Sequence, residues 1–308
     1  MPDRLSPLDR SFLQVETGCA HMHVAGRLRF IPTADAPAIT LDRVRALVAA
    51  RLHLSARFRQ RLALPPGGLR GMGGGCWVDD DAFDLRAHVT ALSGDEEPIS
   101  RERFAALADE ALSQPLDRRR PLWRIYLAPW LQDGSVGLIL KIHHAMVDGA
   151  SALGLGLLLL DTDPHAAPAA PVSWEPDPVP GSVRLAADAL ADYGSESLRA
   201  VRGAARALGS GRRIADTVRR TALAMEEDVL RAAPSSYMNC ALGARRRLNG
   251  HRADIGELLE LRAARGTTLN DVGLAVVTGA LRSLAHERGT VPSPLKAMVP
   301  VDRRAEGE

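Results

Sequence analysis

The feature of this 308-residue chain that most restricts its fold is an apolar run that ends in two adjacent histidines. Residues 136–142 are apolar or glycine except for one lysine, and they lead directly into His143 and His144. A short run of this kind is typical of a buried strand. Asp148 and Gly149 follow, where an aspartate can cap the next helix and a glycine permits a tight turn. We therefore predict a buried strand whose end lifts a side chain out of the core into a cleft.

The two histidines are candidates for catalysis. The unperturbed pKa of histidine lies at about 6.5, so an imidazole beside a cleft suits a general base. Adjacent strand residues point to opposite faces of a sheet, so one ring faces the cleft while the other packs. Two alternatives stay open: ordinary strand-end histidines, or a metal site with Asp148 that His21 and His23 would join. The metal alternative is disfavoured because adjacent histidines diverge and the spacing is not that of a helical zinc site, so we expect no metal.

The rest of the chain alternates between strand and helix patterns, which predicts an α/β fold with a mixed sheet. The turn sequence Asp133-Gly134 lies between two apolar runs and predicts a hairpin. Strands are expected at Met22–Ile31, Phe58–Leu64, Cys76–Val78, Leu122–Leu131, Val136–Ile142, Arg245–Arg252 and Leu295–Val301. Helices are expected at Thr40–Leu54, Ser100–Ser113, Gly149–Leu160, Asp254–Arg265 and Leu269–Arg288, with two more inside Ser182–Ala232.

Composition narrows the classes of function. The formal net charge is +2, which gives no indication of nucleic-acid binding. Three cysteines without a CxxC pair fit a reducing cytoplasm. The apolar runs are far shorter than the roughly 20 residues of a membrane-spanning helix, so lipid would be handled peripherally. The segment Ser182–Ala232 is rich in arginine and predicts either a membrane-surface helix or a solvated helix face.

Further motifs are spread over most of the chain. They are Leu5–Asp9 with Phe12, Met22–Val24, Arg57–Leu62, Trp77–Asp84, Pro115–Asp117, Pro121–Trp123, Asn270–Asp271 and Met298–Val301. The segment His143–Gly149 matches the HHxxxDG signature of the chloramphenicol-acetyltransferase-like superfamily. Together with the other motifs, it makes the chain resemble the bacterial wax ester synthase/diacylglycerol acyltransferase family.

The resemblance implies a two-lobed α/β sandwich with a tunnel between the lobes. It implies a complete N-terminal lobe at 1–161, a linker with crossover helices at 162–235 and an incomplete C-terminal lobe at 236–308, since family members continue beyond Glu308. His144 is implied to be the base, and Asp148 a structural partner of an arginine. Asn270, next to Asp271, is implied to position the site or the thioester oxygen. The segment Pro121, Leu122 and Trp123 is implied to shape the fold.

The implied activity is the transfer of a fatty acyl group from acyl-CoA to diacylglycerol or a long-chain fatty alcohol. Coenzyme A enters as the thioester substrate, and no cofactor is expected. The implied location is cytoplasmic, at the periphery of the inner membrane or of lipid inclusions. Two alternatives remain: another HHxxxDG chemistry, such as condensation or acetyl transfer, and a truncated, catalytically impaired homologue that binds acyl-CoA or lipid.

Overall fold

The computed structural model describes residues 3–66, 75–94, 97–128, 130–146, 163, 169–209, 236, 238 and 240–297. The chain forms two compact units, one of residues 1–202 with 242–248 and the other of 203–241 with 249–308. The predicted boundaries at 161 and 235 concern lobes and stay predictions. Among the helices in the described ranges, none combines the length and the apolar character of a membrane-crossing segment.

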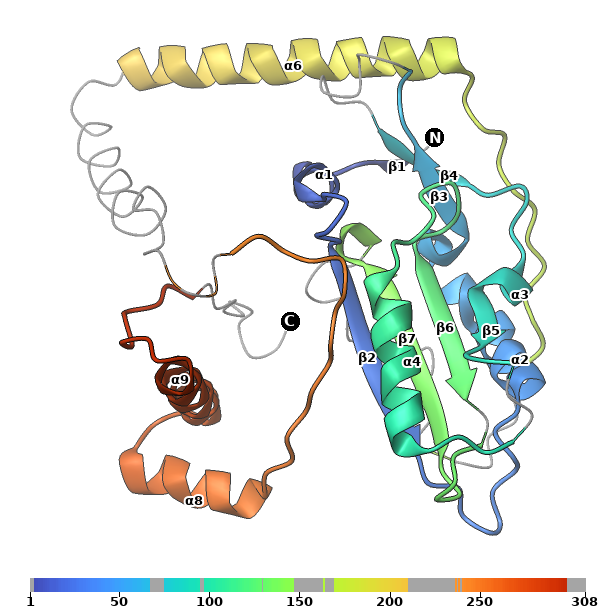
Figure 1. The fold of residues 1–308 in the computed structure, drawn as a ribbon. Helices are drawn as coiled ribbons and strands as arrows, with labels where there is room; N and C mark the ends of the chain where they lie inside the picture. Colours follow the sequence, from blue (N-terminus) through green and yellow to red (C-terminus); the bar gives the residue numbers. More distant parts are fainter. Residues whose placement is uncertain are drawn as a thin grey trace. The chain divides into compact units, whose positions relative to one another are not determined.

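A four-stranded mixed sheet forms the centre of the first unit (Figure 1). Its strand order is β2 (His23–Phe30), β7 (Val136–His143), β6 (Trp123–Ala128) and β5 (Val89–Ala91). The pairs β2–β7 and β6–β7 are antiparallel, whereas β5 runs parallel to β6. The predicted α/β class with a mixed sheet is therefore confirmed.

The hairpin predicted at Asp133-Gly134 is also confirmed. Gly134 has a φ of 78°, a left-handed value that glycine adopts without steric cost. The Asp133 carboxylate accepts a 3.0 Å hydrogen bond from the N–H of Ser135, and it is ion-paired with Arg29 and Arg101. These contacts close the turn and fix the register of β6 against β7.

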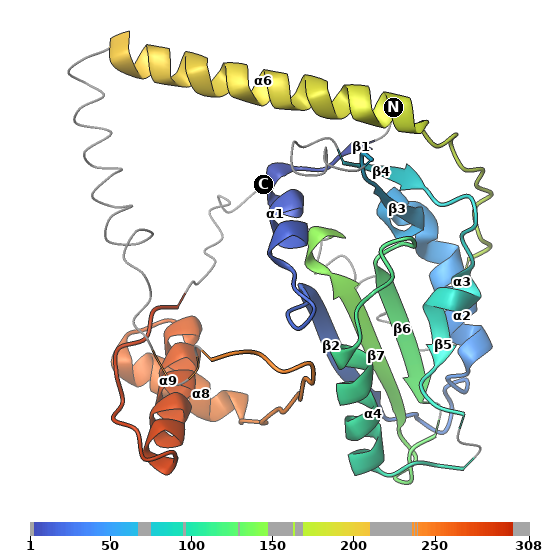
Figure 2. The ribbon, with the colours of Figure 1, turned by 45° about the horizontal axis from the view of Figure 1, so that its top comes forward.

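Two helices cover opposite faces of this sheet (Figure 2). Val48 of α2 (Leu41–Arg51) lies in one hydrophobic cluster with Leu138, while Phe104 of α4 (Arg101–Ser113) lies in another with Ile139. The alternation along β7 thus sends neighbouring residues to different helices. Both helices begin where the sequence predicts, at the N-caps Thr40 and Ser100.

A second, smaller sheet has the order β1 (Asp3–Arg4), β4 (Cys76–Asp79) and β3 (Gln60–Ala63). The long helix α6 (Ser182–Gly209) buries Leu185 in a cluster with Cys76 and Val78. The other elements that the structure describes in the first unit are the helices α1 (Pro7–Val15) and α3 (Leu85–His88) and the 3₁₀ turns η1 (Leu52–Leu54), η2 (Ala56–Arg59) and η4 (His144–Met146).

The second unit contains α8 (Ile255–Arg265) and α9 (Leu269–Glu287). As predicted, α8 begins at the N-cap Asp254 and ends at Gly266, which has a φ of 61°. The predicted helices at Gly149–Leu160 and beyond residue 209 lie outside the described residues, as do residues 298–301 of the last predicted strand.

The strand predicted at Arg245–Arg252 is wrong. Its backbone pairs with side chains of α4 rather than with another strand. The N–H of Arg246 donates to Oγ of Ser113 at 2.7 Å, and the N–H of Leu248 donates to Oδ1 of Asp109 at 2.8 Å. The alternating pattern therefore reflects an extended segment that binds a helix.

Candidate active site

The two histidines lie where β7 ends. His143 is the last residue of β7, and His144 opens the turn η4. The side chain of His143 is 1% exposed, whereas His144 is partly exposed. His143 faces Glu16 and His23, while the ring of His144 lies against Phe12. The two rings therefore have different neighbours.

Each ring nitrogen of His143 has a polar group beside it. The N–H of Ala145 donates to Nδ1 at 3.0 Å, and Nε2 lies 3.0 Å from Oε1 of Glu16. An Nδ1 that accepts a hydrogen bond carries no proton, so the ring proton is on Nε2, the nitrogen beside the carboxylate. Nε2 makes no aligned hydrogen bond among the described residues, so its contact with Glu16 is an electrostatic one at 3.0 Å. This arrangement fixes one tautomer and one orientation of the buried ring.

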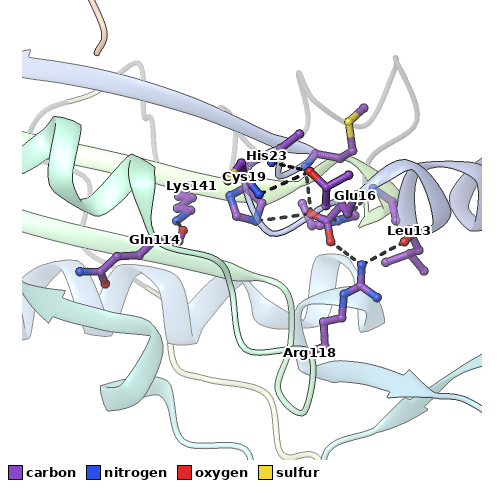
Figure 3. Close-up of polar contacts among 12 residues, drawn as sticks. Leu13, Glu16, Cys19, His23, Gln114, Arg118 and Lys141 are labelled. Carbon is purple, nitrogen blue, oxygen red and sulfur yellow. Dashed lines mark hydrogen bonds and ion pairs between the residues drawn. The ribbon is translucent and has the colours of Figure 1, made fainter. Parts of the chain in front are cut away.

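The Glu16 carboxylate is the centre of the polar network in Figure 3. It accepts a 2.9 Å hydrogen bond from the N–H of Met22 and is ion-paired with Arg118. Burial by itself raises the pKa of Glu16, but the contacts with His143, Arg118 and Met22 outweigh it. They hold the pKa well below its usual range, so Glu16 is ionised at neutral pH.

His23 pairs with His143 across β2 and β7, and the two rings meet edge to face with centroids 5.8 Å apart. Burial, together with the charge of Lys141, lowers the pKa of His23 to about 3. His23 is therefore neutral at working pH. Within the part of the chain that the structure describes, no group of three or more histidine, cysteine, aspartate or glutamate side chains is placed to hold a metal ion.

His144 is held through its main chain and supported by a ring. Its N–H donates to the carbonyl oxygen of Met22 at 2.7 Å. Its imidazole stacks on Phe12 of α1, with centroids 4.0 Å apart and planes 23° apart. Nδ1 is buried and has no hydrogen-bond partner among the described residues. Asp148 and Gly149 lie outside those residues, so their roles stay predictions.

The segment Pro121–Trp123 belongs to the core of the first unit. Leu122 and Trp123 are fully buried, and Nε1 of Trp123 donates to the carbonyl oxygen of Phe58 at 2.8 Å. The ring of His88 stacks on Trp123 with centroids 4.6 Å apart. The carbonyl oxygen of Leu122 accepts from the N–H of His143 at 2.9 Å. This segment therefore supports the strand that carries the histidines.

Asn270 and Asp271 lie in the first turn of α9, as the sequence predicts. The N-cap Thr268 and Asp271 form a reciprocal capping box, in which Oγ1 of Thr268 accepts from the N–H of Asp271 at 3.2 Å. Asp271 thus stabilises the helix start. Asn270 is exposed and belongs to the second unit, and its role toward a thioester stays a prediction.

Sequence reasoning missed most of the network behind the histidines. Glu16 and Arg118 are 102 residues apart, and no local spacing connects them. Lys141 alone gave a signal, as a charged residue inside an apolar strand. Its Nζ donates to the carbonyl oxygens of Ala111 and Gln114 where α4 ends.

The mixed sheet and the paired histidines at the end of its inner strand define an α/β domain with a candidate general base. Residues 5–273 match the sequence model of the wax ester synthase/diacylglycerol acyltransferase catalytic domain. The chain belongs to this family.

The chain is similar to mycobacterial proteins whose names describe diacylglycerol O-acyltransferases. A protein of Mycobacterium tuberculosis H37Rv is 31% identical over 301 residues, which cover 94% of this chain and 61% of the relative. A Mycobacterium bovis protein is 31% identical over 306 residues, covering 99% and 65%. The solved wax ester synthase/diacylglycerol acyltransferase of Marinobacter aquaeolei VT8 has the same fold, with a TM-score of 0.61 at 24% identity over 94% of this chain and 62% of that one. The chain thus spans less than two thirds of each.

Proposed function

We propose that the chain transfers a fatty acyl group from acyl-CoA to the hydroxyl of diacylglycerol or a long-chain alcohol, with His144 as general base. Family membership supports the reaction class. The observation that carries the residue assignment is the contrast between the two rings. His143 is buried between the N–H of Ala145 and the Glu16 carboxylate, whereas His144 is partly exposed and is held by Met22 and Phe12.

The chemistry follows from this contrast. Nδ1 of His144 is buried, so Nε2 is the nitrogen that meets a substrate. Nε2 takes the proton from the acceptor hydroxyl, and the oxygen attacks the thioester carbonyl carbon. The tetrahedral intermediate then expels the coenzyme A thiolate, which takes the proton back from the imidazolium. General base catalysis of this kind contributes about 10²–10⁴-fold in rate.

The test is a transfer assay with labelled palmitoyl-CoA and either 1,2-dioleoylglycerol or hexadecanol. We expect His144→Ala to lower kcat by at least about 10²-fold. His53→Ala removes an exposed histidine and serves as the matched control. His143→Ala tests the buried ring, and we expect it to lower the free energy of unfolding as well as the rate. A His144→Ala variant with the turnover of the wild type would refute the assignment.

The same assay separates the alternatives. Ester formed with only one acceptor identifies the substrate class. An amide or an acetylated small acceptor as product would favour the other HHxxxDG chemistries. Saturable binding of palmitoyl-CoA without product would favour a lipid-binding homologue.

We also propose that α6 binds weakly to anionic lipid surfaces. Val183, Leu190 and Val201 are exposed and recur at spacings that return to one side of a helix. Exposed arginines Arg199 and Arg202 lie on the same helix. We expect co-sedimentation with phosphatidylglycerol vesicles at low salt that high salt reverses, since salt screens such attraction. Co-sedimentation that fails at low salt would contradict this proposal.

A further inference from the structure

Glu16 connects the elements that support the two histidines. It is the residue at which α1 ends, and its side chain is 12% exposed. Oε1 lies 3.0 Å from Nε2 of His143 and accepts the N–H of Met22 at 2.9 Å, while Oε2 is bound by Arg118. A carboxylate engaged on both oxygens by a cation and by N–H donors is held in one orientation. It can therefore fix the groups around it.

Three routes lead from this carboxylate to His144. The first passes through His143, whose Nε2 lies 3.0 Å from Oε1 of Glu16 and whose Nδ1 accepts the N–H of Ala145. Ala145 belongs to the turn that His144 opens. The second passes through Met22, whose N–H is bound by Glu16 and whose carbonyl oxygen accepts the N–H of His144 at 2.7 Å.

A third route follows α1. Arg118, which binds Glu16, also donates to the carbonyl oxygen of Leu13 at 3.0 Å (Figure 3). These contacts tie down the end of α1, the helix whose Phe12 stacks on the imidazole of His144. The Glu16 carboxylate thus fixes the position of both the main chain and the ring of His144.

We infer that Glu16 is a positioning residue for His144. Its carboxylate holds His143 in the Nε2–H tautomer and, together with Met22 and Arg118, sets the place of the His144 imidazole. The inference rests on the proposed function, which gives His144 the role of base. Misplacement of a reacting group by about 1 Å costs about 10²-fold in rate, so loss of this support is measurable.

The first test is Glu16→Gln, which keeps the shape of the side chain but replaces one accepting oxygen with a donating amide. We expect kcat to fall about 10²-fold, with the KM for palmitoyl-CoA little changed. The free energy of unfolding also falls, because the ionised carboxylate stabilises the fold, so kcat is measured where the variant is fully folded. The matched control is Glu102→Gln in the exposed first turn of α4. In the double variant with His143→Ala, the loss in activation free energy should be smaller than the sum of the losses in the two single variants. Part of the effect of Glu16→Gln passes through the His143 ring, which the double variant lacks.

The second test does not depend on turnover. Nitrogen-15 NMR of the histidine rings reports which nitrogen carries the proton. We expect His143 to be the Nε2–H tautomer in the wild type and to lose that preference in Glu16→Gln. An unchanged tautomer together with an unchanged kcat would overturn the inference. If the wild-type chain transfers no acyl group, the proposed function fails, and the NMR result alone decides whether Glu16 holds His143.

Discussion

Lys141 gives the folded chain a specific dependence on pH. Its side chain is fully buried in β7, and its ammonium group donates to Ala111 and Gln114 at the end of α4. Burial, with a smaller contribution from the charge of Arg124, lowers the pKa of Lys141 from its ordinary 10.5 to about 8. Between these two values the unfolded chain holds the proton and the folded chain has released it. The free energy of unfolding therefore increases as the pH rises through this window.

The size of the effect follows from the shift. One pKa unit corresponds to about 1.4 kcal/mol, so the whole window is worth roughly 3 kcal/mol. The assay is urea unfolding followed by tryptophan fluorescence from pH 7 to pH 11, on the wild type and on Lys141→Met. The variant also leaves the two carbonyl groups without their donor, a pH-independent cost of about 1–3 kcal/mol for each.

The decisive quantity is therefore the difference between the two curves as a function of pH. Groups that titrate in both proteins cancel in that difference. We expect the free energy of unfolding of the wild type, minus that of Lys141→Met, to increase by about 3 kcal/mol as the pH rises from about 8 to 10.5. Lys296→Met removes the other lysine, which is exposed, and serves as the matched control for the loss of a lysine side chain. Parallel curves for the wild type and Lys141→Met would refute the reasoning.

Two further predictions concern packing and capping. A Cβ atom at Gly137 would lie 2.6 Å from the ring of Phe104. Gly137→Ala should therefore lower the free energy of unfolding by about 1–3 kcal/mol. Unchanged stability in a urea titration would contradict the tight contact between β7 and α4. Asp271→Ala removes the reciprocal cap at Thr268, and it should destabilise the start of α9 by about 1 kcal/mol. Hydrogen exchange of the first-turn amides measures that loss, and unaltered protection would show that the cap contributes nothing.

The parts of the fold that the sequence predicts are those determined by neighbouring residues. The hairpin at Asp133-Gly134 and the caps Thr40, Ser100 and Asp254 depend on contacts within a few positions. The strand predicted at 245–252 is wrong because the hydrogen-bond partners of this segment are side chains of α4, more than a hundred positions away. An alternating pattern does not reveal whether the partner is a strand or a helix.

The same distinction holds for the site. The paired histidines are adjacent in the chain, and their two rings have different surroundings because the strand ends between them: His143 is the last residue of β7, whereas His144 opens the turn η4. Glu16 and Arg118 reach them only through tertiary packing, and nothing in their own neighbourhoods marks them. The inward lysine was visible as an anomaly, but its partners at the end of α4 were not.

Strand β2, which lies beside the two histidines, is at the edge of the described sheet. Within the described sheet β2 is an outer strand, hydrogen-bonded along its length to β7 and bordered by no other strand on its far side. Outer strands open more readily than inner ones, so fraying at this margin can precede global melting. Detachment at the His23 end would loosen Met22 and deprive both imidazoles of their shared anchorage while the hydrophobic interior is still intact. Acyl-transfer activity would then be lost at a lower temperature than that at which the first unit unfolds.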